Sequence, residues 1–308
     1  MKVLIFSATG FISQPAALAF VRAGHIVYGT TRSEESGKLL AKLEIIPVVC
    51  DATSEAGRQI WEKLVGEVDV VLDSTPAVGS EVPLKTFKHT VSKVADRPAG
   101  AALTYIYCGG SWVHSRGTGG LDSWTDERQP HSGQNKLTAW RWDVEKEVLA
   151  SKDVHGIVVR PPVMYGTSGS LMVNMAFKPA MESAKTGETF ETVGNKDTRF
   201  LTVHHDDLAD LFLRVAERAP ICKGQAFVAA NPHSERYTDI LDAVVRVSGA
   251  KGYALRAPDE RNPFEIAWAS TTNLKPSLAH ALTGWVPRKM GLVDGMDIYW
   301  ASFKANLQ

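Results

Sequence analysis

The segment from Ser111 to Gly133 gathers side chains that could do chemistry. It is rich in glycine and polar residues, it contains Trp112, His114 and His131, and Trp140 follows it closely. Imidazole and hydroxyl groups can hold or transfer protons, and indole faces suit a flat, apolar or aromatic substrate. We therefore expect Trp112, His114, His131 and Trp140 to contact a substrate, although Trp140 could equally anchor its helix in the core.

A phosphate-binding turn is predicted near the N-terminus. Residues 2–6 form an apolar run typical of a buried strand, residues 15–23 have the apolar spacing of a helix, and residues 25–30 form a second strand. A turn of small residues joins the first strand to the helix, where backbone N–H groups and the positive end of the helix dipole favour phosphate. The alternative is a strand–helix–strand unit that binds nothing. The residues expected to contact a dinucleotide here are Ser7, Thr9, Gly10, Phe11 and Ile12.

The end of the second strand bears on which dinucleotide binds. An NAD site usually has an acidic residue there for the ribose hydroxyl, whereas this chain has Thr30, Thr31, Arg32 and Ser33. Arg32 offers a planar fork for a 2′-phosphate and Ser33 another hydrogen bond, so we predict NADP(H) as cofactor. The alternative is a solvated arginine without a ligand.

Composition narrows the class of protein. The chain has 308 residues, with 34 basic and 34 acidic side chains, so we expect neither nucleic acid nor a membrane as partner. Its three cysteines, Cys50, Cys108 and Cys222, lack metal or disulfide spacing, and no signal peptide is recognised. We expect a cytoplasmic monomer or homodimer that binds a small molecule.

Strands and helices alternate along the chain, which predicts a parallel sheet with right-handed crossovers. The fold class is α/β: a doubly wound Rossmann sheet in residues 1–165, with a smaller α+β substrate lobe mainly in residues 166–308. Residues 200–230 are expected to return to the sheet. Ligands bind beyond the carboxyl ends of such strands, so Ser74 and Thr75, after the fourth strand, should lie along the cofactor.

Three strings resemble those of the extended and atypical short-chain dehydrogenase/reductases, the NAD(P)-dependent epimerase/dehydratase-like proteins. Residues 7–13 (SATGFIS) resemble the GxxGxxG fingerprint, with serine at both outer positions, and residues 160–166 (RPPVMYG) resemble RPxxVYG. Residues 202–209 (TVHHDDLA) resemble the VHVDDLA string. The resemblance implies an adenine contact at Asp51 and Ala52, which could alternatively be a helix cap. It also places Cys108, Gly109, Pro161 and Val163 beside the cofactor.

The resemblance further implies a Tyr, a Lys four residues later and a Ser, which donate a proton to a carbonyl and hold its oxygen. Here Lys136 stands at the Lys position, but Ser132 replaces the Tyr and Gly109 replaces the Ser. The catalytic residues we expect are Lys136, Ser132, Ser111 and Tyr165, with His131, His114 or water as other proton donors.

Three activities remain open. The first is an NADP(H)-dependent oxidoreductase for a small apolar or aromatic carbonyl or alcohol, with Ser111 replacing the lost hydroxyl. The second is a non-redox isomerase, epimerase or lyase that uses the same pocket. The third is a binding protein that senses NADP(H).

A cluster of acids and imidazoles in residues 204–210 could suggest a metal site. Adjacent side chains on a strand point to opposite faces, so His204 and His205 would be poor co-ligands. A strand end followed by a helix capped by Asp206 also explains the cluster. We expect no metal.

Overall fold

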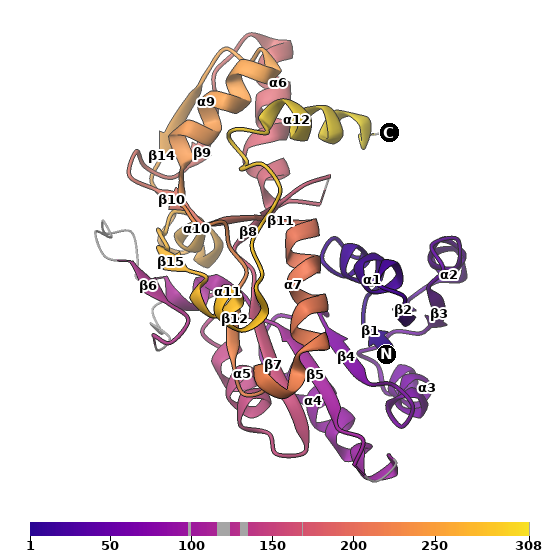
Figure 1. Ribbon diagram of the computed structural model, residues 1–308. Helices are drawn as coiled ribbons and strands as arrows, with labels where there is room; N and C mark the ends of the chain where they lie inside the picture. Colours follow the sequence, from indigo (N-terminus) through magenta and orange to yellow (C-terminus); the bar gives the residue numbers. More distant parts are fainter. Residues whose placement is uncertain (98–99, 116–123, 130–134, 168, 308) are drawn as a thin grey trace.

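The computed structural model of the chain describes residues 1–97, 100–115, 124–129, 135–167 and 169–307. Its centre is a seven-stranded sheet whose neighbouring strands all pair in parallel (Figure 1). In spatial order the strands are β12 (Ala226–Val228), β7 (Val154–Arg160), β5 (Leu103–Cys108), β4 (Val70–Asp73), β1 (Lys2–Ile5), β2 (Ile26–Thr31) and β3 (Ile46–Val49). The strand order changes direction between β1 and β4, which confirms the predicted doubly wound Rossmann sheet.

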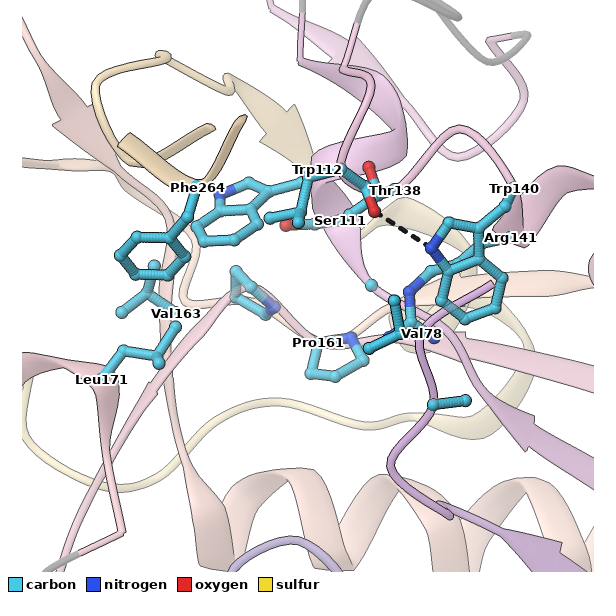
Figure 2. A pocket seen from close by; sticks show the side chains of 14 residues that line it. Val78, Ser111, Trp112, Thr138, Trp140, Arg141, Pro161, Val163, Leu171 and Phe264 are labelled. Atoms are coloured by element: carbon cyan, nitrogen blue, oxygen red, sulfur yellow. Dashed lines mark hydrogen bonds between the residues drawn. The ribbon is translucent and has the colours of Figure 1, made fainter. Parts of the chain in front are cut away.

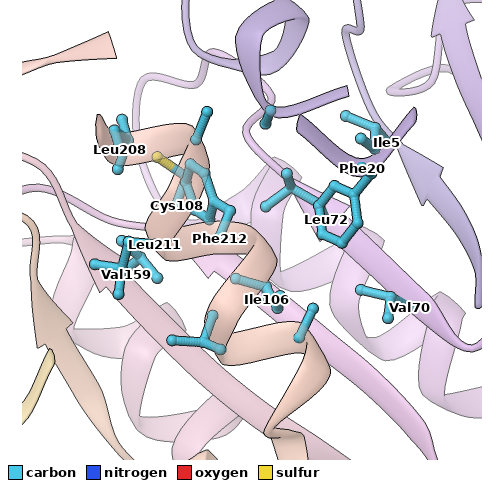
Figure 3. Close-up of a cluster of buried hydrophobic side chains, with 14 of the residues drawn as sticks. Ile5, Phe20, Val70, Leu72, Ile106, Cys108, Val159, Leu208, Leu211 and Phe212 are labelled. Atoms are coloured by element: carbon cyan, nitrogen blue, oxygen red, sulfur yellow. The ribbon is translucent and has the colours of Figure 1, made fainter. Parts of the chain in front are cut away.

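Helices cover both faces of this sheet because successive side chains on its strands point to opposite sides. On β1, Val3 and Ile5 belong to one apolar core, whereas Leu4 belongs to the other. Figure 3 shows the first core, where Phe20 and Phe212 pack over the sheet. Its main helices are α1 (Ser13–Arg22), α7 (His205–Glu217), α8 (Ala219–Cys222) and α11 (Ser277–Thr283); α2 (Glu34–Ala41) adds Leu40. The second core is covered by α3 (Glu55–Val65), α4 (Glu81–Ser92) and α5 (Arg141–Ala150).

A separate apolar core lies in the C-terminal part of the chain, drawn at the top of Figure 1. Its helices are α6 (Lys178–Thr186), α9 (Tyr237–Ser248), α10 (Pro263–Trp268) and α12 (Met296–Ala305), with a π-helical turn at Val173–Phe177. Four two-stranded pairs complete the fold: β8 (Val163–Tyr165) with β11 (Thr202–His204), β9 (Phe190–Val193) with β14 (Tyr253–Arg256), β10 (Arg199–Phe200) with β13 (Glu235–Arg236), and β6 (Thr125–Asp126) with β15 (Leu274–Lys275). Short 3-10 helices occur at Val94–Asp96 and Ser111–His114.

The chain leaves this second region and rejoins the sheet through β12, which pairs with β7. The division into residues 1–165 and 166–308 remains a prediction. Among the described residues, no helix is long and apolar enough to cross a bilayer.

Candidate functional site

The turn after β1 has the strained geometry that its sequence suggests. Ser7 has a φ of 55°, in the left-handed region that side-chain-bearing residues rarely adopt. Two hydrogen bonds hold this conformation: the Ser7 N–H donates to Thr30 Oγ1 at 2.9 Å, and the Gly10 N–H donates to the Ser7 carbonyl at 2.8 Å. The strand β2 thus fixes a turn whose backbone conformation would favour glycine.

The first turn of α1 keeps its N–H groups free of side-chain caps. Ile12 stands at the N-cap, whereas α2 and α3 begin with serines, Ser33 and Ser54, whose hydroxyls accept backbone N–H bonds. The Gln14 N–H donates to the Gly10 carbonyl at 2.9 Å and Pro15 has no N–H, so the N–H groups of Ile12 and Ser13, together with the helix dipole, are those that can attract an anion. They border a cavity of about 290 Å³ that is lined by Ser7, Gly10, Phe11, Ile12, Ser13, Ser74, Pro76, Pro162, Met164, Gly169 and Leu171.

Two close contacts shape the wall of this cavity, which we call the turn cavity. The Ser13 and Ser74 hydroxyl oxygens lie 2.6 Å apart, so the start of α1 is tied to the end of β4. A Cβ at Gly10 would lie 3.1 Å from the Ser7 carbonyl oxygen, and one at Gly169 would lie 2.4 Å from the Phe11 ring. A side chain at Gly169 would overlap the Phe11 ring, so this position needs glycine, whereas one at Gly10 would only crowd the Ser7 carbonyl oxygen.

The residues expected at the adenosine end lie at the ends of β2 and β3. Arg32 is exposed directly after β2. Hydrogen bonds from Thr53 are the main cause that lowers the pKa of the Asp51 carboxyl, and the charge of Arg32 lowers it further. Asp51 accepts bonds from the Thr53 N–H at 3.0 Å and from its hydroxyl at 2.7 Å. Ser54, and not Asp51, caps α3. Ala52 is buried, and its carbonyl accepts a bond from Trp61.

A second cavity, of about 320 Å³, lies at the carboxyl ends of β4 and β5 (Figure 2). Most of its wall is apolar: Ala77, Val78, Trp112, Leu137, Trp140, Pro161, Pro162, Val163, Leu171 and Phe264. The polar side chains on its wall are those of Ser111, Thr138 and Arg141. We call it the aromatic cavity. Pro162 and Leu171 line both cavities, so the two adjoin.

No protein-family model and no curated protein matches this chain. Solved structures with the same fold do match it. A dTDP-glucose 4,6-dehydratase from Bacillus anthracis in complex with NAD superposes with a TM-score of 0.78 at 12% identity, over 100% of this chain and 97% of its own. The chain has the fold of nucleotide-sugar dehydratases and epimerases.

Two further structures support that statement. A UDP-glucuronic acid 4-epimerase from Bacillus cereus in complex with UDP-glucuronic acid and NAD has a TM-score of 0.72 at 14% identity, over 99% of this chain and 99% of its own. A nucleoside-diphosphate-sugar epimerase from Pseudomonas aeruginosa has a TM-score of 0.73 at 17% identity, over 100% of this chain and 98% of its own. At these identities the likeness establishes the fold, which agrees with the epimerase/dehydratase-like resemblance of the sequence.

Within this fold, one predicted catalytic residue lies in the aromatic cavity. Ser111 lines it and is 2% exposed. Lys136 is exposed in a turn before α5 and lines neither cavity, so the structure gives its predicted role no support. Ser132 and His131 lie outside the described residues.

Tyr165 does not reach either cavity. It is 1% exposed, its hydroxyl donates to the Met290 carbonyl at 2.7 Å, and it accepts a bond from Asn231 Nδ2 at 3.1 Å. Burial raises the pKa of Tyr165 well above its usual range. These contacts argue against the predicted role as proton donor, since the hydroxyl is used in packing the C-terminal core.

The predicted substrate contacts divide in the same way. Trp112 and Trp140 line the aromatic cavity, where Trp112 meets Phe264 edge-on at 6.2 Å between ring centroids. The Trp140 indole N–H donates to the Leu137 carbonyl at 3.0 Å, which fixes its ring on the wall. His114 is instead buried away from the cavity, so the structure does not support it as a substrate contact.

His114 belongs to a buried ion-pair network beneath Gly109. Arg160 bonds Glu145 Oε2 through Nε at 3.0 Å and through NH2 at 2.6 Å. Its NH1 lies 2.8 Å from His114 Nε2, and because a guanidinium only donates, this nitrogen is the acceptor. A Cβ at Gly109 would lie 2.5 Å from Glu145 Oε1. The carboxylate of Glu145 thus fills the space that a side chain at Gly109 would need.

Several predicted cofactor residues lie off the turn cavity. Pro161 and Val163 line the aromatic cavity, and Cys108 is buried in the first apolar core. Thr9 is exposed, and the Thr75 N–H donates to Asp73 Oδ1 at 3.0 Å. Their contact with a dinucleotide remains a prediction.

Thr138, Arg141 and Phe264 are among the residues of the aromatic cavity that the sequence did not identify. Thr138 is 7% exposed, and its hydroxyl oxygen has no hydrogen-bond partner within the described part of the chain. Arg141 directly follows Trp140, which was the available signal for it. Phe264 comes from α10, more than a hundred positions later, where nothing local connects it to the site.

The imidazole cluster corrects one prediction. His204 and His205 do not point to opposite faces: their rings stack with centroids 4.4 Å apart, because β11 ends at His204 and α7 begins at His205. Potential ligand atoms of both and of Asp206 all lie within 4.8 Å of one another. However, His204 Nδ1 accepts the Asp206 N–H at 3.1 Å, and the Lys289 ammonium lies 2.9 Å from Asp206 Oδ2. A cation already faces the carboxylate, so the absence of a metal remains our prediction.

Proposed function

We propose that the chain is an NADP(H)-dependent oxidoreductase of the atypical short-chain reductase type, acting on a small apolar or aromatic carbonyl or alcohol. One observation carries the proposal: the turn cavity, with its uncapped helix start, adjoins a cavity walled by Trp112, Trp140 and Phe264. The first suits the phosphates of a dinucleotide and the second a flat substrate.

The residues fit a dinucleotide. Gly10 lines the turn cavity, and the N–H groups of Ile12 and Ser13 are the donors available there for a pyrophosphate. The similar structures named above contain NAD. NADP(H) is supported here by Arg32, exposed at the end of β2, and by the absence of an acid in residues 30–33.

When bound, NADPH supplies a hydride to the substrate carbonyl carbon. The Ser111 hydroxyl donates a hydrogen bond to the carbonyl oxygen and stabilises the charge that develops there. Trp112, Trp140 and Phe264 hold the ring and exclude water from its faces. The proton taken up by the oxygen comes from Ser132, His131 or a water molecule, because the usual tyrosine is missing from the sequence and Tyr165 is buried elsewhere.

A non-redox activity is the second candidate. It is favoured by the fold, since several similar structures are described as epimerases. Against a nucleotide sugar stands the small aromatic cavity, whose described wall carries one charged side chain, Arg141.

The experiment is a set of turnover assays with aryl aldehydes, aryl ketones and the corresponding alcohols. We expect NADPH absorbance to fall, and Ser111→Ala to lower kcat by about 10²-fold. Ser92→Ala, at an exposed position of α4, is the matched control. Rearranged product without net change of cofactor would support the non-redox candidate and contradict the proposal. Binding of NADP⁺ and NADPH with different affinities but no turnover would point to a sensor.

A further inference from the structure

Arg141 is an unusual residue for the wall of an apolar cavity. Within the described wall it is the one charged side chain, and no carboxylate of the described chain forms an ion pair with it. Its guanidinium carbon lies 4.6 Å from the centre of the Trp140 ring, so the indole face supports it. The buried Asp73 carboxyl accepts its hydrogen bonds from Tyr105 and Thr75.

Part of the guanidinium is fixed and part is open. NH1 donates to the Tyr107 hydroxyl at 2.9 Å and to the Cys108 carbonyl at 3.4 Å. Nε and NH2 donate to no residue that the structure describes, and a Cβ at Gly110 would lie 3.9 Å from Nε. These two groups form one edge of the guanidinium, the edge that binds a carboxylate through two parallel hydrogen bonds.

Thr138, another polar residue near Arg141 on this wall, does not present its hydroxyl to the cavity. The Thr138 hydroxyl oxygen is buried without a hydrogen-bond partner among the described residues, although Thr138 lines the wall. That oxygen has almost no accessible surface even with the cavity empty, so the argument for a polar ligand rests on Arg141.

We infer that Arg141 binds a carboxylate of the substrate, and that the cavity therefore takes an aromatic carboxylic acid. The acid group lies on the Nε and Nη2 edge, and the ring lies among Trp112, Trp140 and Phe264. That this acid also reacts in the cavity rests on the proposed function. That it binds to Arg141 does not depend on the proposed function.

The test is calorimetric titration of the protein without cofactor, using 2-naphthoate and its neutral isostere 2-naphthamide as probes. We expect the acid to bind at least about tenfold more tightly than the amide, the size of one charge-assisted contact. Arg141→Met keeps the stem on Trp140 and should remove this preference. Arg246→Met, in an exposed ion pair on α9, should not change it.

A variant that folds poorly does not decide the matter, because the wild-type preference is itself decisive. Equal affinity of acid and amide for the wild-type protein, including no binding of either, would overturn the inference. Tyr107→Phe removes the hydroxyl that holds NH1 and should weaken naphthoate alone. NADPH is also titrated into the wild-type protein. If NADPH does not bind, the proposed function is contradicted. If naphthoate still binds more tightly than naphthamide in that case, the assignment of Arg141 as a carboxylate-binding residue stands.

Discussion

At the residue scale, Gly109 shows why the lost serine cannot simply be restored. A serine there would press its Cβ against Glu145 Oε1, in a carboxylate held by Arg160 inside the molecule. We expect Gly109→Ser to lower the free energy of unfolding by about 1–3 kcal/mol, as overpacking of a buried site usually does. Urea denaturation measures it.

Gly110→Ala is the control for Gly109→Ser. The backbone at Gly110 is extended, with a φ of −175°, and its Cβ would have 3.9 Å to the nearest atom, Arg141 Nε. That variant should be as stable as the wild type. A stable Gly109→Ser protein that gained carbonyl reduction, alone or together with Ser132→Tyr, would contradict our account of this position.

Arg32 determines the expected choice of dinucleotide. We expect Arg32→Ala to weaken NADPH by about tenfold or more and to leave NADH nearly unchanged, because only NADPH carries the 2′-phosphate. Tryptophan fluorescence quenching gives both affinities. Lys38→Ala, which removes a charge near the other end of α2, is the control. An Arg32→Ala protein that still prefers NADPH would show that Arg32 does not bind the 2′-phosphate.

At the element scale, the junction of β11 and α7 predicts a pH dependence. Burial, together with His205 and Lys289, lowers the pKa of His204 from 6.5 to about 4, and Asp206 opposes this shift. As the pH falls, His204 therefore takes up a proton in the unfolded chain before it does so in the folded one. The contribution of neutral His204 to the free energy of unfolding is complete above pH ~6.5 and is lost toward pH ~4. Its nitrogen also caps α7.

His204→Asn keeps a good capping side chain but removes the titration. Between pH ~7.5 and pH ~5, the wild type should lose about 2 kcal/mol of unfolding free energy more than this variant. His280→Asn, at an exposed position in α11, should retain the wild-type slope. Parallel slopes for wild type and His204→Asn would show that His204 does not titrate as described.

The elements also show what the sequence could predict. The alternating apolar runs identified the parallel sheet, because each run must be buried on both faces. The family spacing assumes a helix at Lys136, whereas residues 136–140 form a turn and α5 begins only at Arg141, so the catalytic role of Lys136 stays a prediction. The stacking of His204 on His205 was missed because His205 was treated as a strand neighbour of His204, although α7 begins at His205. The cap of α7 is His204, and not Asp206 as expected.

At the scale of the whole molecule, the site combines segments that lie far apart in the chain. The turn after β1, the ends of β4 and β5, the residues after β7 and Phe264 of α10 line two adjoining cavities. The Rossmann topology makes the first three predictable, because parallel strands end at one edge. Phe264 depends on packing between distant elements, which a single sequence does not reveal.

The crystal structure with NADP⁺ bound tests the central claim most directly, namely that the two cavities form one site. We predict the pyrophosphate at the Gly10 turn, the 2′-phosphate within hydrogen-bond distance of Arg32, and the nicotinamide ring against Pro162 and Leu171, facing Ser111. A dinucleotide bound elsewhere, or a nicotinamide ring that does not reach the aromatic cavity, would contradict the account.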